Sequence, residues 1–203
     1  MPRPKAYEPD KVLEDAMKFF WAEGYEPASI PKLEKHLGIN RFSIYDSFGS
    51  KRGLFLKALD IYSRMLIDSL VEPLENGSRG LSDLETFFSN FQKLFLGRNV
   101  PRGCLLCNTA IEVGSRDAEI AKKVESYFGR IESAALACLL RARDLGEIEG
   151  DKAGLECRAR VARLCLQGIL MDLRVGRSRQ YVMLDMEALG ACVTPADIRT
   201  RKH

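Results

Sequence analysis

Apolar side chains recur at helical intervals along almost the whole 203-residue chain, and this pattern constrains the fold more than any other feature. In residues 10–23, Leu13, Ala16, Phe19 and Phe20 fall on one face of a helix. The same spacing predicts further helices over residues 29–37, 41–48, 51–72, 82–95, 104–114, 117–145, 152–175 and 181–193. No segment alternates apolar and polar residues as a half-buried strand does. We therefore expect an all-α fold with about nine helices.

Local signals indicate where several of these helices begin. Asp10, Ser29, Asn40 and Ser50 each stand directly before a helical pattern, where an N-cap side chain satisfies free backbone N–H groups. The segment Ser82–Glu85 has the spacing of a capping box, in which the two side chains satisfy each other's backbone N–H groups. We expect these residues to start the helices that follow them.

The clearest linker in the chain is Pro73 followed by the polar run 75–80, because proline and glycine interrupt helices. A chain of this length accommodates one large domain or two small ones. We expect an N-terminal domain over residues 1–52, a long connecting helix over residues 51–72, and a C-terminal domain over residues 73–203.

The composition excludes two broad classes of protein. Apolar residues make up 46% of the chain and charged residues 29%, which is too apolar for a long disordered chain. A membrane-spanning helix needs about 20 mostly apolar residues, and charged residues interrupt every apolar stretch well before that length. The N-terminus lacks the apolar region of a signal peptide. We expect a cytoplasmic protein without membrane contact, with a disordered tail from Thr200.

The charge of the chain is concentrated in one segment. The 31 basic and 28 acidic residues leave a net charge of +3, too small by itself to indicate a nucleic-acid partner. The segment 29–52 carries this whole excess. It holds five basic residues (Lys32, Lys35, Arg41, Lys51 and Arg52) and two acidic residues (Glu34 and Asp46).

Six cysteines stand in the chain, and the absence of an export signal favours reduced thiols over disulfides. They are Cys104, Cys107, Cys138, Cys157, Cys165 and Cys192. One Cys-x-x-Cys pair and only two histidines do not make a zinc site, so we expect no metal and no cofactor. We find no phosphate-binding loop, nucleophile elbow or other catalytic set, and we therefore expect no enzymatic activity.

Two short predicted helices joined by Gly38-Ile39-Asn40 follow a supporting helix, which is the arrangement of a helix-turn-helix. The residues themselves are more specific. The segments 24–30, 37–40 and 43–55 together closely resemble the N-terminal domain of TetR-type (tetracycline-repressor-like) transcription regulators, over about residues 8–60. The remainder resembles that family in length and helical layout only. The resemblance implies a dimeric DNA-binding regulator, with a variable C-terminal domain that binds an effector.

The resemblance also implies which side chains touch double-stranded DNA. They are Ser29, Asn40, Arg41, Phe42, Ser43, Tyr45 and Lys51. The recognition helix that Asn40 opens places its first turn against base edges in the major groove. Arg41 is the best candidate for base readout, because a guanidinium can bind guanine O6 and N7 together. Arg3 and Lys5 either reach the minor groove or remain in solvent.

Several of these side chains have structural alternatives. Phe42 stands where many relatives carry a small residue, and its ring either contacts a thymine methyl group or packs inside the domain. Tyr45 either contacts a phosphate or belongs to the core alone. For each of Lys32, Lys35 and Arg52, a phosphate contact and an ordinary solvated surface position are equally good interpretations.

The string Arg102-Gly103-Cys104-Leu105-Leu106-Cys107-Asn108 resembles a segment found in one branch of this family, some of whose members sense oxidants, electrophiles or metals. A cysteine in the first turn of a helix and next to Arg102 has a lowered thiol pKa. The alternative is that Cys104 and Cys107 are small apolar core residues, as free cysteines often are.

The helices between residues 82 and 145 are expected to surround an effector cavity. The candidates to line it, each with core packing or exposed surface as its alternative, are Phe91, Cys104, Cys107, Asn108, Glu112 and Tyr127. A ligand there would shift helix 51–72 and so change the separation of the two recognition helices. We therefore expect a repressor that leaves its operator when the effector binds.

The helix 152–175 is apolar on more than one side, which indicates burial against two partners. We expect it to form a homodimer interface together with helix 181–193. A two-fold axis would place the recognition helices roughly 34–36 Å apart and require a palindromic operator. The competing interpretation is a helical protein-interaction module that does not bind DNA.

Overall fold

The computed structural model describes residues 7–97, 100 and 102–194, and every regular element among them is helical. The helices are α1 Pro9–Glu23, α2 Ile30–Leu37, α3 Arg41–Phe48, α4 Lys51–Leu66, a π-helical turn Ile67–Val71, α5 Glu72–Glu75, α6 Leu81–Phe95, α7 Leu105–Val113, α8 Ala118–Asp144, α9 Lys152–Val175 and α10 Arg179–Val193. Because α4, the π-helical turn and α5 are continuous, the described residues form nine helical rods, as expected. Arg3, Lys5 and the tail from Thr200 lie outside the described residues.

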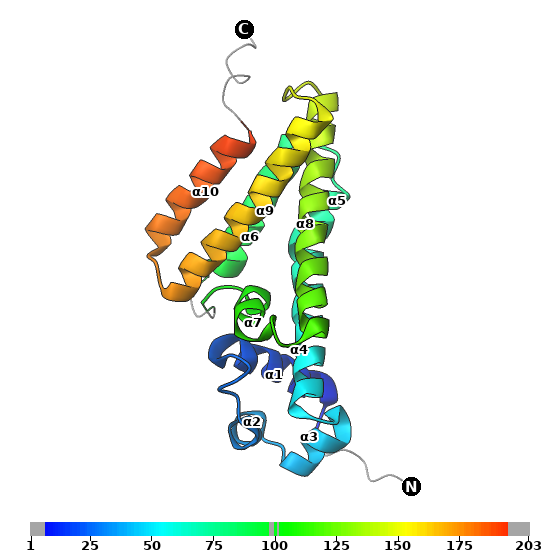
Figure 1. Ribbon diagram of the computed structural model, residues 1–203, viewed down its shortest axis with the longest axis vertical. Helices are drawn as coiled ribbons and strands as arrows, with labels where there is room; N and C mark the ends of the chain where they lie inside the picture. The colour runs from blue at the N-terminus through cyan, green and yellow to red at the C-terminus, as the bar shows by residue number, and fades with distance from the viewer. Residues whose placement is uncertain (1–6, 98–99, 101, 195–203) are drawn as a thin grey trace.

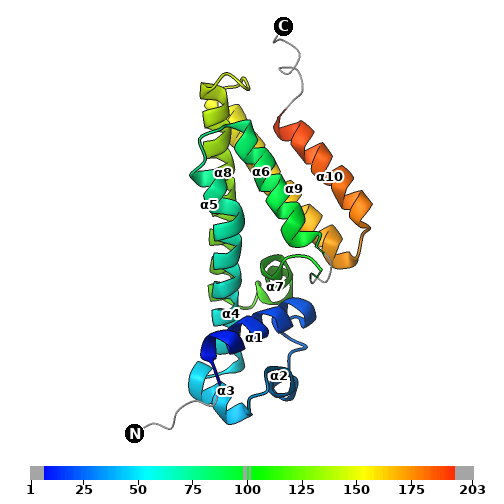
Figure 2. The same cartoon turned by 180° about the vertical axis from the view of Figure 1, so that it is seen from behind.

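The molecule is elongated, with α1, α2 and α3 at one end and α9 and α10 toward the other (Figure 1). Helix α4 leaves the α1–α3 bundle and runs beside α8 along the long axis. In the view from behind, α6 lies in front of α9 (Figure 2). Helix α7 lies between the α1–α3 bundle and the longer helices. The apolar core is continuous through this junction, from Phe20 and Phe55 through Tyr62 to Leu106 and Phe128.

Three of the four predicted N-caps are confirmed. Ser29 accepts a hydrogen bond from the Lys32 backbone N–H and starts α2. Asn40 and Ser50 accept from the backbone N–H groups of the residues three positions later and start α3 and α4. The prediction for Asp10 is wrong, because α1 already begins at Pro9, whose fixed φ suits the first helical position.

The predicted break at Pro73 is also wrong, because the helix passes through Pro73 and ends at Glu75. Proline has no backbone N–H, so it leaves the carbonyl four residues earlier without its usual partner. That carbonyl belongs to Ser69, and the Asn90 side-chain amide of α6 donates to it at 3.2 Å. The π-helical turn directly before Pro73 provides the wider backbone that a proline ring needs.

The predicted capping box at Ser82 does not form. Helix α6 begins one residue earlier, at Leu81, after Gly80 with φ +60°. The Leu81 backbone N–H donates to the Glu147 carboxylate at 2.8 Å, a contact between residues 66 apart in the chain. A distant glutamate therefore takes the role that local spacing assigned to Ser82.

Candidate nucleic-acid interface

The turn between α2 and α3 is fixed by hydrogen bonds within the motif. Gly38 ends α2 in the left-handed conformation (φ +66°), which glycine adopts without steric cost. The side-chain oxygen of Asn40 accepts a hydrogen bond from the Ser43 backbone N–H at 2.9 Å. The Arg41 backbone N–H donates to the Glu34 carboxylate of α2 at 2.5 Å. These contacts hold the first turn of α3 in one orientation relative to α2.

Helix α3 buries one face and presents the other to solvent. Ile44 and Phe48 are buried in the core of the three-helix bundle. On the outer face Arg41 is exposed, Phe42 is 75% exposed and Tyr45 is 43% exposed. Phe42 therefore does not pack inside the domain, and Tyr45 is not a core residue alone. An exposed aromatic ring of this size on a recognition helix is free to meet a base edge.

The first two residues of α4 turn toward the protein rather than away from it. Lys51 Nζ lies 3.4 Å from the Glu26 backbone oxygen and 4.4 Å from the centre of the Tyr25 ring, and burial lowers the pKa of Lys51. Of the basic residues predicted to be near DNA, Lys32, Lys35 and Arg41 are exposed. Lys51 stays a predicted phosphate contact, and it also stabilises the turn after α1.

Arg52 joins the α1–α3 bundle to the start of α8. Its guanidinium donates to both oxygens of Asp117, at 2.7 and 3.0 Å, and to Glu119 at 2.8 Å. Asp117 in turn accepts from the Glu119 and Ile120 backbone N–H groups and caps α8. The hydrogen bonds from Arg52 lower the pKa of Asp117 to about 2. Arg52 is thus neither plain solvated surface nor a free phosphate contact.

Helix α7 is hydrogen-bonded to the α1–α3 bundle at both ends. Just before it, the Gly103 backbone oxygen accepts from the buried Trp21 indole N–H of α1 at 2.8 Å. Near its end, the Glu112 carboxylate accepts from the Tyr25 and Glu26 backbone N–H groups at 2.9 and 2.7 Å. We call this last contact the Glu112 clamp. The sequence predicted Glu112 only as a residue lining a cavity.

The other predicted effector residues are buried or half-buried. Phe91 is buried between the Phe87 and Phe95 rings of α6. Asn108 donates to the Arg102 backbone oxygen at 3.3 Å. Tyr127 is buried at the edge of a hollow of about 450 Å³ between α4 and α8. Burial raises the pKa of Tyr127, and the nearby Cys104 and Cys107 thiols raise it further, so these three predicted residues lie close together.

Cys104 and Cys107 are buried free thiols at the start of α7. Burial opposes ionisation of Cys104, but hydrogen bonds from the Cys107 thiol and from backbone N–H groups bring the Cys104 pKa below its ordinary value. The same interaction and burial raise the pKa of Cys107. The Arg102 guanidinium lies against Gly176 at the end of α9.

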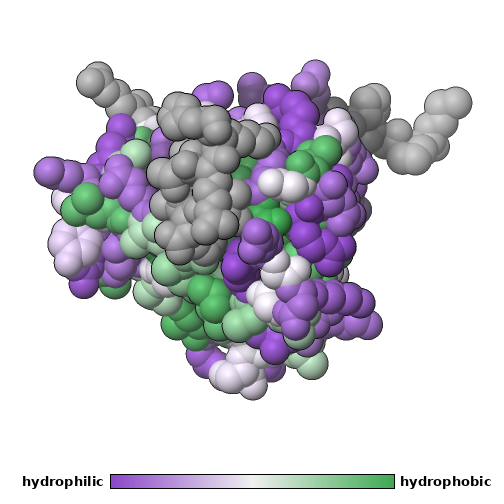
Figure 3. Space-filling view, turned by 90° about the horizontal axis from the view of Figure 1, so that it is seen from above, coloured by the Kyte–Doolittle hydropathy of each residue, from purple (hydrophilic) through white to green (hydrophobic). Residues whose placement is uncertain are grey.

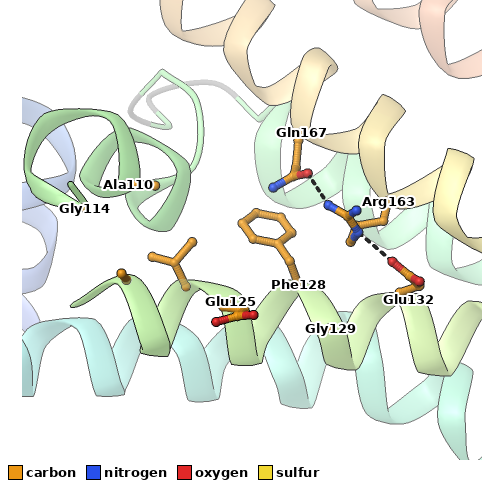
Figure 4. Close-up of a pocket in the computed structure, with 10 residues that line it drawn as sticks. Ala110, Gly114, Glu125, Phe128, Gly129, Glu132, Arg163 and Gln167 are labelled. Carbon is orange, nitrogen blue, oxygen red and sulfur yellow. Dashed lines mark hydrogen bonds and ion pairs between the residues drawn. The ribbon is translucent and has the colours of Figure 1, made fainter. Parts of the chain in front are cut away.

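A groove of about 520 Å³ lies where α7, α8 and α9 meet (Figure 4). Ten residues line it: Ala110, Gly114, Ala121, Val124, Glu125, Phe128, Gly129, Glu132, Arg163 and Gln167. None of the six predicted effector residues is among them, because helical periodicity does not indicate which faces of three helices leave space between them. Among the described residues no group of cysteine, histidine or acidic side chains forms a metal site, and no helix is both long and apolar enough to span a bilayer.

The capped helices α2 and α3 and the exposed outer face of α3 are the features of a helix-turn-helix DNA-binding protein. A protein-family model described as "Bacterial regulatory proteins, tetR family" matches residues 12–58. A second, described as "Tetracyclin repressor-like, C-terminal domain", matches residues 80–189. The chain therefore belongs to the TetR family and is a DNA-binding transcriptional regulator.

Individual relatives agree with this assignment. The chain is 33% identical over 160 residues to YezE, an uncharacterized HTH-type transcriptional regulator of Bacillus subtilis (strain 168), which covers 79% of this chain and 82% of YezE. It is 27% identical over 182 residues to the HTH-type transcriptional repressor ComR of Escherichia coli (strain K12), covering 89% and 86%. It is also similar to a cysteine mutant of the TetR family regulator CifR complexed with 26-bp operator DNA. That match has a TM-score of 0.81 and 25% identity, covering 94% of this chain and 99% of that one.

Proposed function

We propose that this regulator is a repressor that binds a palindromic operator through the outer face of α3. The observation that carries the proposal is the exposed surface of Arg41, Phe42 and Tyr45 on a helix whose first turn is fixed by Asn40. Ser29, Ser43 and Lys51 complete the proposed contact surface. The similarity to ComR, named a repressor, and to CifR bound to operator DNA supports the sign of regulation and the kind of partner.

Dimerisation is proposed through α9 and α10. On α9, Cys157, Val161, Leu164, Met171 and Val175 are exposed and follow one another at helical intervals along one face. Helix α10 also has a row of exposed apolar residues at helical intervals, formed by Tyr181, Leu184, Ala188 and Ala191. Viewed along the long axis, hydrophobic surface gathers in a patch among hydrophilic groups (Figure 3). Exposed apolar stripes on two adjacent helices are the surface that a second copy would bury.

We assign DNA binding to residues 1–52 and effector binding and dimerisation to residues 73–203, with α4 as the connection. The effector is either a small molecule that binds the C-terminal domain or an oxidant or electrophile that reacts with the buried thiols. We further propose that the chain acts by binding rather than by catalysis and that it works in the cytoplasm.

The test is selection of genomic fragments by the purified full-length chain, followed by affinity measurement at several salt concentrations. A DNA-binding regulator selects fragments that share a palindrome, and its affinity falls steeply with salt because counterions are released. A chain that binds no duplex at low ionic strength would instead be the helical protein-interaction module.

Arg41→Ala tests the assignment of base readout. We expect a loss of about 1–3 kcal/mol in operator binding and a relaxed preference at one base pair. Arg64→Ala is a matched control, because Arg64 is an exposed arginine of α4 outside the proposed contact surface. A uniform loss on all duplexes would make Arg41 a phosphate contact only.

A further inference from the structure

The groove between α7, α8 and α9 has the features of a small-molecule site. Val124 and Phe128 form a buried apolar floor, and Phe128 of α8 points toward α9 (Figure 4). Gly129 sits beside them, and a Cβ added to it would meet no other atom within 4 Å. The space beside α8 is therefore open, and its volume of about 520 Å³ lies in the range of ligand pockets.

The charges that line the groove are unbalanced. The Arg163 guanidinium is already engaged, because it donates to Glu132 at 2.7 Å and to the Gln167 side-chain oxygen at 2.7 Å. Arg160 reaches Glu132 as well, at 3.4 Å. Glu125 is exposed and has no hydrogen-bond or ion-pair partner among the described residues. Among the charged residues that line the groove, Glu125 is thus the one without a partner, whereas Arg163 shares Glu132 with Arg160.

A ligand in the groove would touch the part of α7 that holds the DNA-binding bundle. Ala110 and Gly114 line the groove, and they flank Glu112 on the last turns of α7. Glu112 accepts the Tyr25 and Glu26 backbone N–H groups. Displacement of this turn would therefore act directly on the segment between α1 and α2.

We propose that this groove binds an apolar organic cation as the effector, and that the last turn of α7 carries the response to the DNA-binding bundle through the Glu112 clamp. The proposal rests on the proposed function as an effector-responsive repressor. Phe128 offers an aromatic surface to the apolar body and to the cation, and Glu125 offers the opposite charge at the rim. An organic anion would meet the unpaired Glu125 carboxylate and an Arg163 guanidinium whose hydrogen bonds already go to Glu132 and Gln167.

The experiment uses tetraphenylphosphonium and tetraphenylborate, two ions of the same four-phenyl shape and opposite charge. Binding of each to the full-length protein is measured by calorimetry without DNA. We expect saturable binding of the phosphonium with at least about tenfold preference over the borate, because like charges in contact are unfavourable. Equal affinity of the two ions, or no binding of the phosphonium, would overturn the proposal.

Two variants test whether the ion binds in the groove. Glu125→Gln should weaken phosphonium binding about fivefold, the scale of an exposed ion pair, whereas Glu149→Gln removes an exposed carboxylate elsewhere and should leave it unchanged. Gly129→Leu should weaken binding about tenfold or more by filling the groove. Ser126→Leu adds the same side chain to α8 outside the groove and is the control. Unchanged binding in Gly129→Leu would refute the site.

Operator affinity with and without the phosphonium separates this inference from the proposed function. We expect the bound ion to weaken operator binding, and Glu112→Gln to reduce that effect. An ion that binds in the groove without changing operator affinity would overturn its assignment as an effector. A chain that binds no operator in the absence of the ion would refute the proposed function, while the calorimetry would still decide whether the groove binds cations.

Discussion

The Glu112 clamp leads to a prediction about how the two domains communicate. Its carboxylate accepts two backbone N–H groups, from Tyr25 at 2.9 Å and from Glu26 at 2.7 Å, across 86 or 87 residues of sequence. In Glu112→Gln the amide oxygen can accept from one of these groups, but the amide NH2 group faces the other donor. The substitution therefore removes one charge-assisted hydrogen bond and preserves the volume of the side chain.

The magnitude follows from the exposure of the clamp. A hydrogen bond to a charged group contributes about 1.5–3 kcal/mol when it is well shielded from water. Glu112 is half-buried and Glu26 is exposed, so we expect a loss of about 1 kcal/mol in the free energy of unfolding. For a chain of this length that corresponds to a decrease of about 2–4 °C in the melting temperature. A more loosely held DNA-binding bundle should also weaken operator binding about fivefold.

Hydrogen exchange of the Tyr25 and Glu26 amides is the direct assay, because these two groups lose their fixed acceptor. Both should exchange faster in Glu112→Gln, while amides in the middle of α9 keep their rates. Glu149→Gln is the matched control, since Glu149 is an exposed glutamate in the loop before α9. If both amides remain as protected as in the unmodified chain, the clamp does not hold the turn and the reasoning is refuted.

Three further predictions concern local contacts. Asn40→Ala should destabilise α3 by about 1 kcal/mol through loss of its N-cap, with the exposed Asn76→Ala as control; an unchanged melting temperature would contradict it. The folded-state pKa of Asp117 is depressed to about 2, so its stabilising contribution is present above its unfolded pKa of about 4 and is lost as pH falls toward 2. Asp117→Asn should therefore flatten the dependence of the melting temperature on pH in that window, and an identical pH profile would refute the assignment. If the thiols sense an oxidant or electrophile, Cys104→Ser with Cys107→Ser should abolish release from DNA by peroxide or an aldehyde; an unaltered response in the double variant would leave the two cysteines as core residues.

The helix-turn-helix could be read from the sequence because its determinants are local. Ser29, Asn40 and Ser50 each bond to a backbone N–H three residues away, so a short window of sequence contains both partners. The apolar spacing of α1 and α4 similarly reflects which face of each helix is buried. These signals were sufficient to predict the fold class and the helix-turn-helix, whereas only the structure decided that Phe42 and Tyr45 are exposed.

The predictions that failed depended on partners distant in the chain. Pro73 reads as a break because the Asn90 amide that satisfies the freed carbonyl belongs to another helix. Ser82 reads as a cap because Glu147, which takes its place, is far along the sequence. The groove and the roles of Glu112 and Arg52 were missed for the same reason. A single side chain that pairs with another helix leaves no periodic pattern.

The order of residues along the chain thus determined where most of the helices form and which of their faces are apolar. The packing of those helices alone decided that α7 is fastened to the turn between α1 and α2, that Arg52 is bound by Asp117, and that an open groove remains beside Gly129. The physical reason is range. Backbone propensity and capping act over three or four residues, whereas the contacts of Glu112 and Arg52 join residues 65 to 87 positions apart and the groove needs three packed helices.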